Sequence, residues 1–94
     1  MSNEENRPVR ILIADDHQMF IDGLKALLKR EKNIQIIGEV GNGLDALEFI
    51  RKQQPDLLIT DISMPGMTGV ELTRQVKLSY PEVKVLVLSM YNDR

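Results

Sequence analysis

The sequence predicts an α/β domain with a doubly wound parallel sheet. Short apolar runs rich in Val, Ile and Leu alternate with segments whose apolar residues recur at helical spacing, in the order β-α-β-α-β-α-β. Such alternation favours parallel strands joined by right-handed crossovers, with helices covering both faces of the sheet. The 94 residues are enough for one small domain and too few for two.

The first strand–helix unit follows a polar, acidic segment over residues 1–7, which we expect to be a flexible tail. The run 9–14 has the length and β-branching of a strand that is buried on both faces. It stops at an Asp-Asp-His sequence over 15–17. The next apolar residues recur at i, i+4, i+7 and i+8, which predicts an amphipathic helix through Phe20, Leu24, Leu27 and Leu28.

The second unit begins with a more polar strand over residues 34–40, which we expect to lie nearer an edge of the sheet. A Gly-Asn-Gly turn follows, and Asn42 is the expected N-cap of the next helix. That helix ends before Pro55, because the residue preceding a proline disfavours the α region. Its apolar residues are Leu44, Leu47, Phe49 and Ile50.

The remaining elements are a strand over 56–60 that runs into Asp61, a loop over 63–69, a helix, and a strand over 83–88 that ends at Ser89. The sequence stops shortly after this most hydrophobic strand, with no helix to cover it. We therefore expect either a fragment or a second chain that completes the fold. The helix before it is stopped by a proline and carries on one side Val70, Thr73, Val76 and Lys77.

Composition excludes several functional classes. Twelve basic against fourteen acidic residues give a net charge of −2 and no basic footprint for nucleic acid or an anionic membrane. Without cysteine there is no disulfide framework, thiolate metal site or cysteine nucleophile. No apolar run approaches the ~20 residues that span a bilayer, and the polar start is unlike a signal peptide. We expect a cytoplasmic protein without membrane contact.

Acidic residues follow two of the predicted strands, where the functional crevice of an open parallel sheet lies. Asp15 and Asp16 follow the first strand, Asp61 follows the third, and Ser89 follows the fourth. Three carboxylates in one crevice repel one another unless a cation neutralises them, and oxygen ligands without His or Cys select Mg²⁺. A carboxylate beside such an ion can attack phosphorus and form an acyl phosphate. The sequence thus predicts a phosphoryl-transfer site.

Each of these residues also has an ordinary structural explanation. An Asp-Asp pair between a strand and a helix is often turn chemistry with a helix N-cap, and a lone Asp61 after a strand is often a turn residue. The three carboxylates together favour the site. Local sequence leaves Ser89 equally open as a loop hydroxyl or as a phosphate partner. The position of His17 where a helix begins favours a surface or capping role over that of a catalytic base.

Three stretches, residues 11–17, 56–69 and 85–89, resemble the receiver domain of two-component response regulators. The acid pair, the D-x-x-M-P-G-x-x-G sequence of 61–69 and the strand-end serine occur in order at receiver spacing. The sequence A-D-D-H-Q-M-F, which begins at Ala14, is most similar to the LuxR/NarL-type transcriptional regulators that carry a C-terminal helix-turn-helix domain. The resemblance implies a flavodoxin-like receiver fold.

The resemblance also implies roles for individual residues. Asp61 is the implied phosphoacceptor, which takes a phosphoryl group from a sensor histidine kinase. Asp15, Asp16 and Asp61 are the implied Mg²⁺ ligands, together with the backbone carbonyl of Ser63. Ser89 is the implied switch residue that moves towards the phosphoryl group. Such a domain is a phosphoacceptor and not an enzyme. It is expected to form a homodimer and to reach DNA only through an output domain absent here.

The sequence departs from the receiver pattern at its end. A receiver has five strands and five helices, so we expect a truncated receiver over 8–94 that lacks the last helix, strand and helix. The lysine that pairs with the phosphoryl group is then missing, which weakens the stabilisation of the transition state of phosphoryl transfer. The alternative hypothesis is a phosphorylation-incompetent fragment that self-associates through its exposed fourth strand. A phosphatase with an Asp nucleophile is disfavoured, because Ser63 stands where a second acid is needed.

Overall fold

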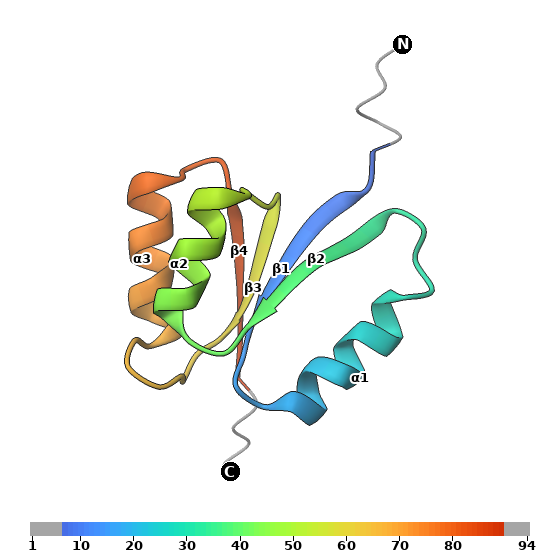
Figure 1. Cartoon of the computed structure of the whole chain (residues 1–94), viewed down its shortest axis with the longest axis horizontal. Helices are drawn as coiled ribbons and strands as arrows, with labels where there is room; N and C mark the ends of the chain where they lie inside the picture. Colours follow the sequence, from blue (N-terminus) through green and yellow to red (C-terminus); the bar gives the residue numbers. More distant parts are fainter. Residues whose placement is uncertain (1–6, 90–94) are drawn as a thin grey trace.

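A computed structural model describes residues 7–89, in which four strands and three helices alternate along the chain (Figure 1). The predicted flexible tail lies outside the described residues except for Arg7, which is exposed. Within 7–89, no helix is long and apolar enough to cross a membrane. The elements are β1 (Val9–Ala14), α1 (Gln18–Leu28), β2 (Ile34–Val40), α2 (Gly43–Lys52), β3 (Leu57–Asp61), α3 (Gly69–Ser79) and β4 (Lys84–Leu88).

The four strands form one sheet in the order β2-β1-β3-β4, and every neighbouring pair is parallel. This is the order of a flavodoxin-like sheet, in which the chain reverses its direction of winding between the first and third strands. Helix α1 covers one face of the sheet, and α2 and α3 cover the other (Figure 1). The predicted α/β fold with a doubly wound parallel sheet is confirmed.

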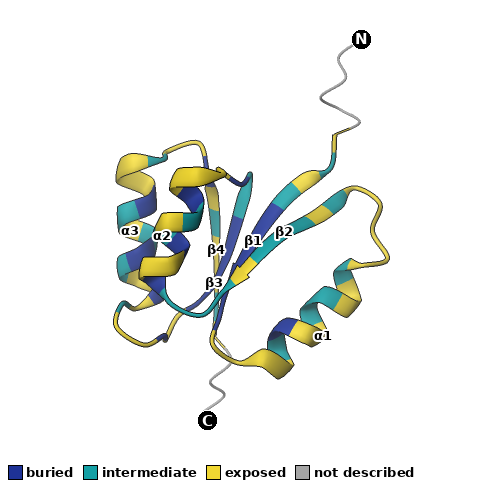
Figure 2. Ribbon diagram, viewed as in Figure 1, coloured by how far each residue is buried: buried dark blue, intermediate teal, exposed yellow. Residues whose placement is uncertain are grey.

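Strands β1 and β3 carry the core, because their alternating side chains point to opposite faces of the sheet. Leu12 and Leu58 pack with α2 and α3, whereas Ile13 and Ile59 pack with α1. Both central strands are mostly buried, as predicted for the first of them (Figure 2). Strand β2 lies at one edge, as its polar sequence predicts, and β4 lies at the other edge of the described sheet.

The predicted inward faces of two helices are partly wrong. In α1 the buried residue is Ile21, while Leu27 is 67% exposed. In α3 the buried residues include Leu72 and Val76, while Val70 is 60% exposed. In each helix the side that meets the sheet therefore includes an apolar residue outside the predicted pattern, Ile21 in α1 and Leu72 in α3.

Helix α3 is oriented by a close backbone approach at its first residue. A Cβ atom on Gly69 would lie 2.1 Å from the carbonyl oxygen of Asp61, so only glycine fits there. The Gly69 amide donates to the carbonyl of Ile62 at 2.8 Å. This contact turns the side of the helix that contains Leu72 and Val76 towards the sheet, since residues three and four apart share one face.

Candidate functional site

The carboxyl ends of β1 and β3 place two acidic side chains beside each other. Ala14 pairs with Thr60 in the parallel register, and each is followed by an aspartate, Asp15 and Asp61. Asp15 is 1% exposed and Asp61 is 4% exposed, so both carboxylates are buried where the strands end. Asp16 follows in the chain and is exposed. The three predicted carboxylates therefore meet at one edge of the sheet.

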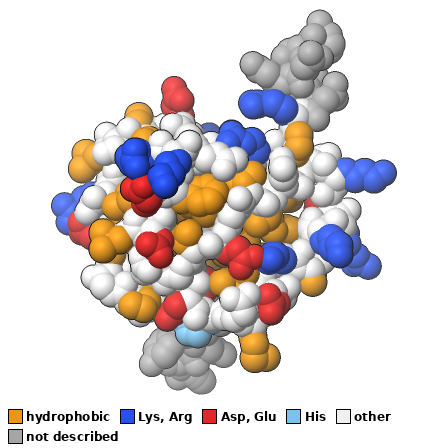
Figure 3. All heavy atoms as spheres, in the orientation of Figure 1, with side chains coloured by type: hydrophobic (Ala, Val, Ile, Leu, Met, Phe, Trp, Pro, Cys, Tyr) orange, Lys and Arg blue, Asp and Glu red, His pale blue; other side chains and the backbone are white. Residues whose placement is uncertain are grey.

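The four chemical groups at this edge form a compact cluster. One ligand atom from each of Asp15, Asp16, His17 and Asp61 lies within 4.8 Å of the corresponding atoms of the other three. Figure 3 shows acidic side chains beside the histidine at the lower end of the molecule, where the carboxyl ends of the strands lie. Carboxylates at this separation repel one another strongly in a partly buried site, because little water lies between them.

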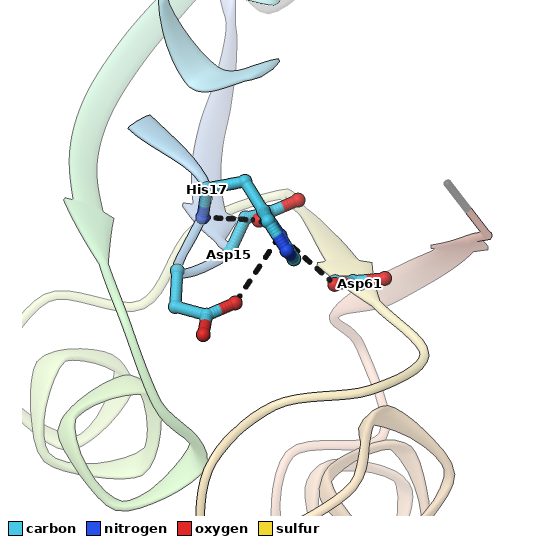
Figure 4. A group of neighbouring side chains, drawn as sticks. Asp15, His17 and Asp61 are labelled. Atoms are coloured by element: carbon cyan, nitrogen blue, oxygen red, sulfur yellow. Dashed lines mark hydrogen bonds and ion pairs between the residues drawn. The ribbon is translucent and has the colours of Figure 1, made fainter. Parts of the chain in front are cut away.

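His17 belongs to the cluster, which the sequence interpretation did not anticipate. Its Nδ1 atom lies 2.9 Å from Asp15 Oδ1, 3.2 Å from Asp16 Oδ1 and 3.5 Å from Asp61 Oδ2 (Figure 4). The hydrogen bond to Asp15 and the charges of the three carboxylates raise the pKa of His17 above its ordinary 6.5. The premise that no histidine lies near the carboxylates is therefore wrong.

His17 is also the N-cap residue of α1, as one of the predicted roles implies, but its side chain makes no capping hydrogen bond. Its backbone amide donates to Asp15 Oδ1 at 2.7 Å, which holds the start of the helix against the end of β1. The imidazole is then left to point at the carboxylates. Only three residues lie between the buried strand β1 and α1, and this was the available clue, because so short a connection keeps His17 near the edge of the sheet.

One buried carboxylate oxygen in the cluster has no hydrogen-bond partner among the described residues. This oxygen is Asp15 Oδ2. A buried anionic oxygen without a partner costs free energy that a bound cation recovers. Carboxylate oxygens are the donors that Mg²⁺ takes in proteins. The donor set and this oxygen therefore fit a divalent cation at the cluster.

The β3–α3 loop forms one wall of a pocket above the cluster. Gly66 takes a φ of +82°, a backbone region that favours glycine, and so turns the loop after Pro65. Thr68 ends the loop by accepting a hydrogen bond from the Glu71 amide at 3.1 Å, which caps α3. The pocket is lined by Asp16, His17, Asp61, Ile62, Ser63, Met64, Pro65 and Ser89.

Ser89 reaches this pocket from the end of β4. The Ile62 amide donates to the carbonyl of Leu88 at 3.0 Å, and this bond ties the chain after β3 to the chain before Ser89. The structure thus brings Ser63 and Ser89 to the same pocket as Asp61. An open pocket with a buried carboxylate, further acidic donors and two serines is suited to holding a cation and an oxyanion together.

The order of the strands and the acidic pocket at their carboxyl edge define a flavodoxin-like domain with its site at the switch point of the sheet. The chain belongs to the response regulator receiver domain family, whose sequence profile matches residues 11–94. It is thus the receiver domain of a two-component response regulator, a signalling class that is generally distinct from classical enzymes.

Similar proteins are transcriptional regulators of the NarL/LuxR type, as predicted. The chain is 43% identical over 89 residues to the transcriptional regulatory protein DegU of Brevibacillus brevis, covering 95% of the chain and 37% of that protein. It is 39% identical over 84 residues to the response regulator VraR of Staphylococcus saprophyticus, covering 89% of the chain and 40% of that protein. The chain therefore spans well under half the length of these curated relatives.

Solved structures agree with the fold. The receiver domain of the response regulator NarL from Mycobacterium tuberculosis superposes with a TM-score of 0.82 at 33% identity, covering 93% of this chain and 70% of that one. Response regulator RcsB of Salmonella typhimurium superposes with a TM-score of 0.85 at 29% identity, covering 93% of this chain and 45% of that one. Both are receiver-containing regulators, which confirms the flavodoxin-like receiver fold.

Proposed function

We propose that the chain is a phosphoacceptor domain in which Asp61 takes a phosphoryl group from a phosphohistidine of a sensor histidine kinase. The observation that carries this proposal is the position of Asp61, whose buried carboxylate lines an open pocket beside two further aspartates. A carboxylate oxygen attacks phosphorus, the bond from phosphorus to the donor nitrogen breaks, and the departing imidazole takes up a proton. The product is an aspartyl phosphate.

The reaction depends on Mg²⁺ in this proposal. Asp15, Asp16 and Asp61 hold the ion with their carboxylates, and the backbone carbonyl of Ser63 adds a further oxygen. The Oδ2 atom of Asp15, which has no hydrogen-bond partner among residues 7–89, supports this assignment. When bound, Mg²⁺ supplies positive charge that offsets the charge of the carboxylates and of the phosphoryl oxygens. Asp61 can then approach a phosphoryl group without strong repulsion.

Ser89 acts as the switch residue in this proposal. Its place on the pocket at the end of β4 allows its hydroxyl to donate a hydrogen bond to a phosphoryl oxygen on Asp61. A movement of Ser89 pulls on the end of β4, which is joined to the chain after β3 by the Ile62–Leu88 hydrogen bond. Phosphorylation is thereby coupled to an edge strand of the described sheet.

The partners follow from the relatives. One solved structure contains two RcsB dimers bound to two parallel DNAs. We propose that this chain likewise works as a homodimer and reaches DNA only through another part of a regulator. The balanced charge of the chain, −2 overall, fits a segment that does not itself hold DNA. A cytoplasmic location remains a prediction.

Intact-protein mass spectrometry after incubation with a small phosphodonor, with and without Mg²⁺, tests the proposal. We expect a Mg²⁺-dependent gain of one phosphoryl group that Asp61→Asn abolishes. Asp56→Asn is the matched control, because Asp56 lies just before β3 at the opposite end of the same strand. Equal labelling of the wild type and of Asp61→Asn overturns the assignment of the phosphoacceptor.

A second candidate function is self-association through β4. Among residues 7–89 this strand has one sheet neighbour, β3, and its residues Leu86 and Val87 are 47% and 36% exposed. An unpaired apolar edge favours pairing with another strand. Light scattering over a wide range of concentrations tests this function, and a monomeric mass at every concentration excludes it. A dimer that fails to gain the phosphoryl group favours this candidate over the phosphoacceptor.

A further inference from the structure

The geometry around His17 Nδ1 resembles the coordination shell of a metal ion. In an octahedral shell with bonds of about 2.1 Å, neighbouring ligand atoms lie roughly 3.0 Å apart and opposite ones roughly 4.2 Å apart. Nδ1 lies 2.9, 3.2 and 3.5 Å from one oxygen each of Asp15, Asp16 and Asp61. These three distances are close to the spacing of neighbouring ligands, which is where a fourth ligand would lie. The four ligand atoms lie within 4.8 Å of one another, so the widest pair must move closer together before all four bind one ion.

Two further features keep the imidazole at this place. The His17 backbone amide is bound to Asp15 Oδ1 at 2.7 Å, so the start of the side chain is held beside the strand end. The ring is about half exposed (53%), and its Nδ1 atom lies beside the carboxylates. Asp15 Oδ2 is independently buried without a hydrogen-bond partner among the described residues, which points to a cation at the same carboxylate.

We propose that His17 Nδ1 is a ligand of the cation site and makes the site prefer divalent transition ions over Mg²⁺. This inference rests on the cation site of the proposed function and adds one donor to it. Oxygen-only sites suit Mg²⁺, whereas an imidazole nitrogen favours ions such as Co²⁺ and Ni²⁺. A single neutral imidazole among three carboxylates therefore changes the selectivity of the site more than its total charge.

The same distances also describe a competing arrangement, in which the ring only hydrogen-bonds to the carboxylates and must leave before any ion enters. The two arrangements predict opposite effects of removing the ring. A ligand that is lost weakens the binding of transition ions specifically. A blocking group that is lost strengthens the binding of every divalent ion. The comparison of two ions on two variants therefore separates them.

The experiment is calorimetric titration of the whole chain with Mg²⁺ and, separately, with Co²⁺ in slightly alkaline buffer. The variant is His17→Asn, because an Asn amide occupies a place similar to Nδ1 and is a preferred N-cap, so the start of α1 is retained. Asp61→Asn serves as the control that binding takes place at the cluster, and we expect it to weaken both ions.

We expect His17→Asn to lower the affinity for Co²⁺ by about tenfold or more and to change the affinity for Mg²⁺ by less than about threefold. In the wild type, Co²⁺ also shifts the ring-proton resonances of His17, which are unambiguous because the sequence has one histidine. Equal changes for both ions, a gain for both ions, or unshifted ring protons overturn the assignment. If Mg²⁺ binds the wild type but not Asp61→Asn, the cation site of the proposed function stands whatever His17 does. Failure of Mg²⁺ to bind at all overturns that site itself.

Discussion

The two ends of β3 each have an aspartate, and the two carboxylates have opposite surroundings. At the start of the strand, Asp56 Oδ2 accepts a hydrogen bond from the Arg10 amide at 2.8 Å. The backbone of Asp56 also bonds to Arg10 and Lys84, so this residue joins three strands. At the other end, Asp61 is buried beside the carboxylates of Asp15 and Asp16, and its Oδ2 atom lies 3.5 Å from His17 Nδ1. We call this the crowded end of the strand. Asp56 completes the hydrogen bonding of the sheet, whereas Asp61 is held beside other carboxylates that repel it.

This difference separates a carboxylate that supports the sheet from one that our proposal assigns to a functional site. A carboxylate that accepts backbone hydrogen bonds adds stability, because its charge is satisfied locally. Buried carboxylates that face one another lower stability and persist only because the surrounding core holds them in place. Here that core consists of β1, which is fully buried from Ile11 to Ala14, and the helices on both faces. The carboxyl end of the sheet is therefore the end at which our proposal places a ligand.

The largest expected effect comes from breaking the backbone approach that positions Asp61. Gly69→Ala places a Cβ atom 2.1 Å from the Asp61 carbonyl oxygen, so the start of α3 or the end of β3 must move. We expect a loss of about 2–3 kcal/mol in the free energy of unfolding, measured with urea. The control is Gly23→Ala in α1, where a Cβ meets no atom within 4 Å. This substitution should add about 0.5–1 kcal/mol, and equal effects of the two variants would contradict the prediction.

A smaller loss is expected at the satisfied end of the strand. Asp56→Ala removes the acceptor of the Arg10 amide and leaves that donor without its partner. We expect the free energy of unfolding to fall by about 1–2 kcal/mol in urea titrations. Asp56→Asn retains an acceptor oxygen and should lose less. A variant Asp56→Ala as stable as the wild type would mean that water replaces the carboxylate without cost.

Much of this contrast was predictable from residue type and position in the chain. The alternation of apolar runs with helical segments predicted parallel strands. The aspartates directly after β1 and at the end of β3 predicted the acidic edge of the sheet. The motif that ends at Gly69 has a physical basis in the contact with Asp61. The role of Asp56 was not anticipated, because a residue placed inside a predicted strand gives no sign that its side chain will bond to a neighbouring strand.

The part that could not be predicted depends on side-chain direction. The participation of His17 follows from the angle at which α1 leaves the sheet edge, which apolar spacing does not determine. The same limit explains why Leu27 and Val70 were expected inside and are exposed. Spacing shows that a helix has an apolar side, but contacts such as the one at Gly69 decide which side turns inward.

An effect of opposite sign is expected at the crowded end of the strand. Asp61→Asn removes one buried negative charge and keeps the shape of the side chain, so it should raise the free energy of unfolding without metal by about 1 kcal/mol. Saturating Mg²⁺ should stabilise the wild type and leave the variant nearly unchanged. Thermal unfolding with EDTA and with Mg²⁺ measures both effects. A variant that is destabilised without metal would place Asp61 in the same structural category as Asp56.

The smallest expected effect is a pH dependence of the metal-free chain that originates at the crowded end. The hydrogen bond to Asp15 raises the pKa of His17 above 6.5, so the charged imidazole is favoured in the folded state. Its stabilising contribution is fully present below pH 6.5 and is lost as pH rises through the raised pKa. Thermal unfolding in EDTA, measured from pH 6.5 to above the raised pKa of His17, should therefore show a melting temperature that falls as pH rises.

His17→Asn should remove this slope, since other shifted groups titrate elsewhere. The Arg51 hydrogen bond lowers the pKa of Glu48 below 4.5, so its contribution is present above that value and disappears only in acid. The Glu39 hydrogen bond raises the pKa of Lys25 above 10.5, so its contribution is lost only in strong base. A slope near neutral pH that survives in His17→Asn would mean that the imidazole does not stabilise the carboxylates. The imidazole would then not act as an internal cation for these carboxylates when no metal is bound.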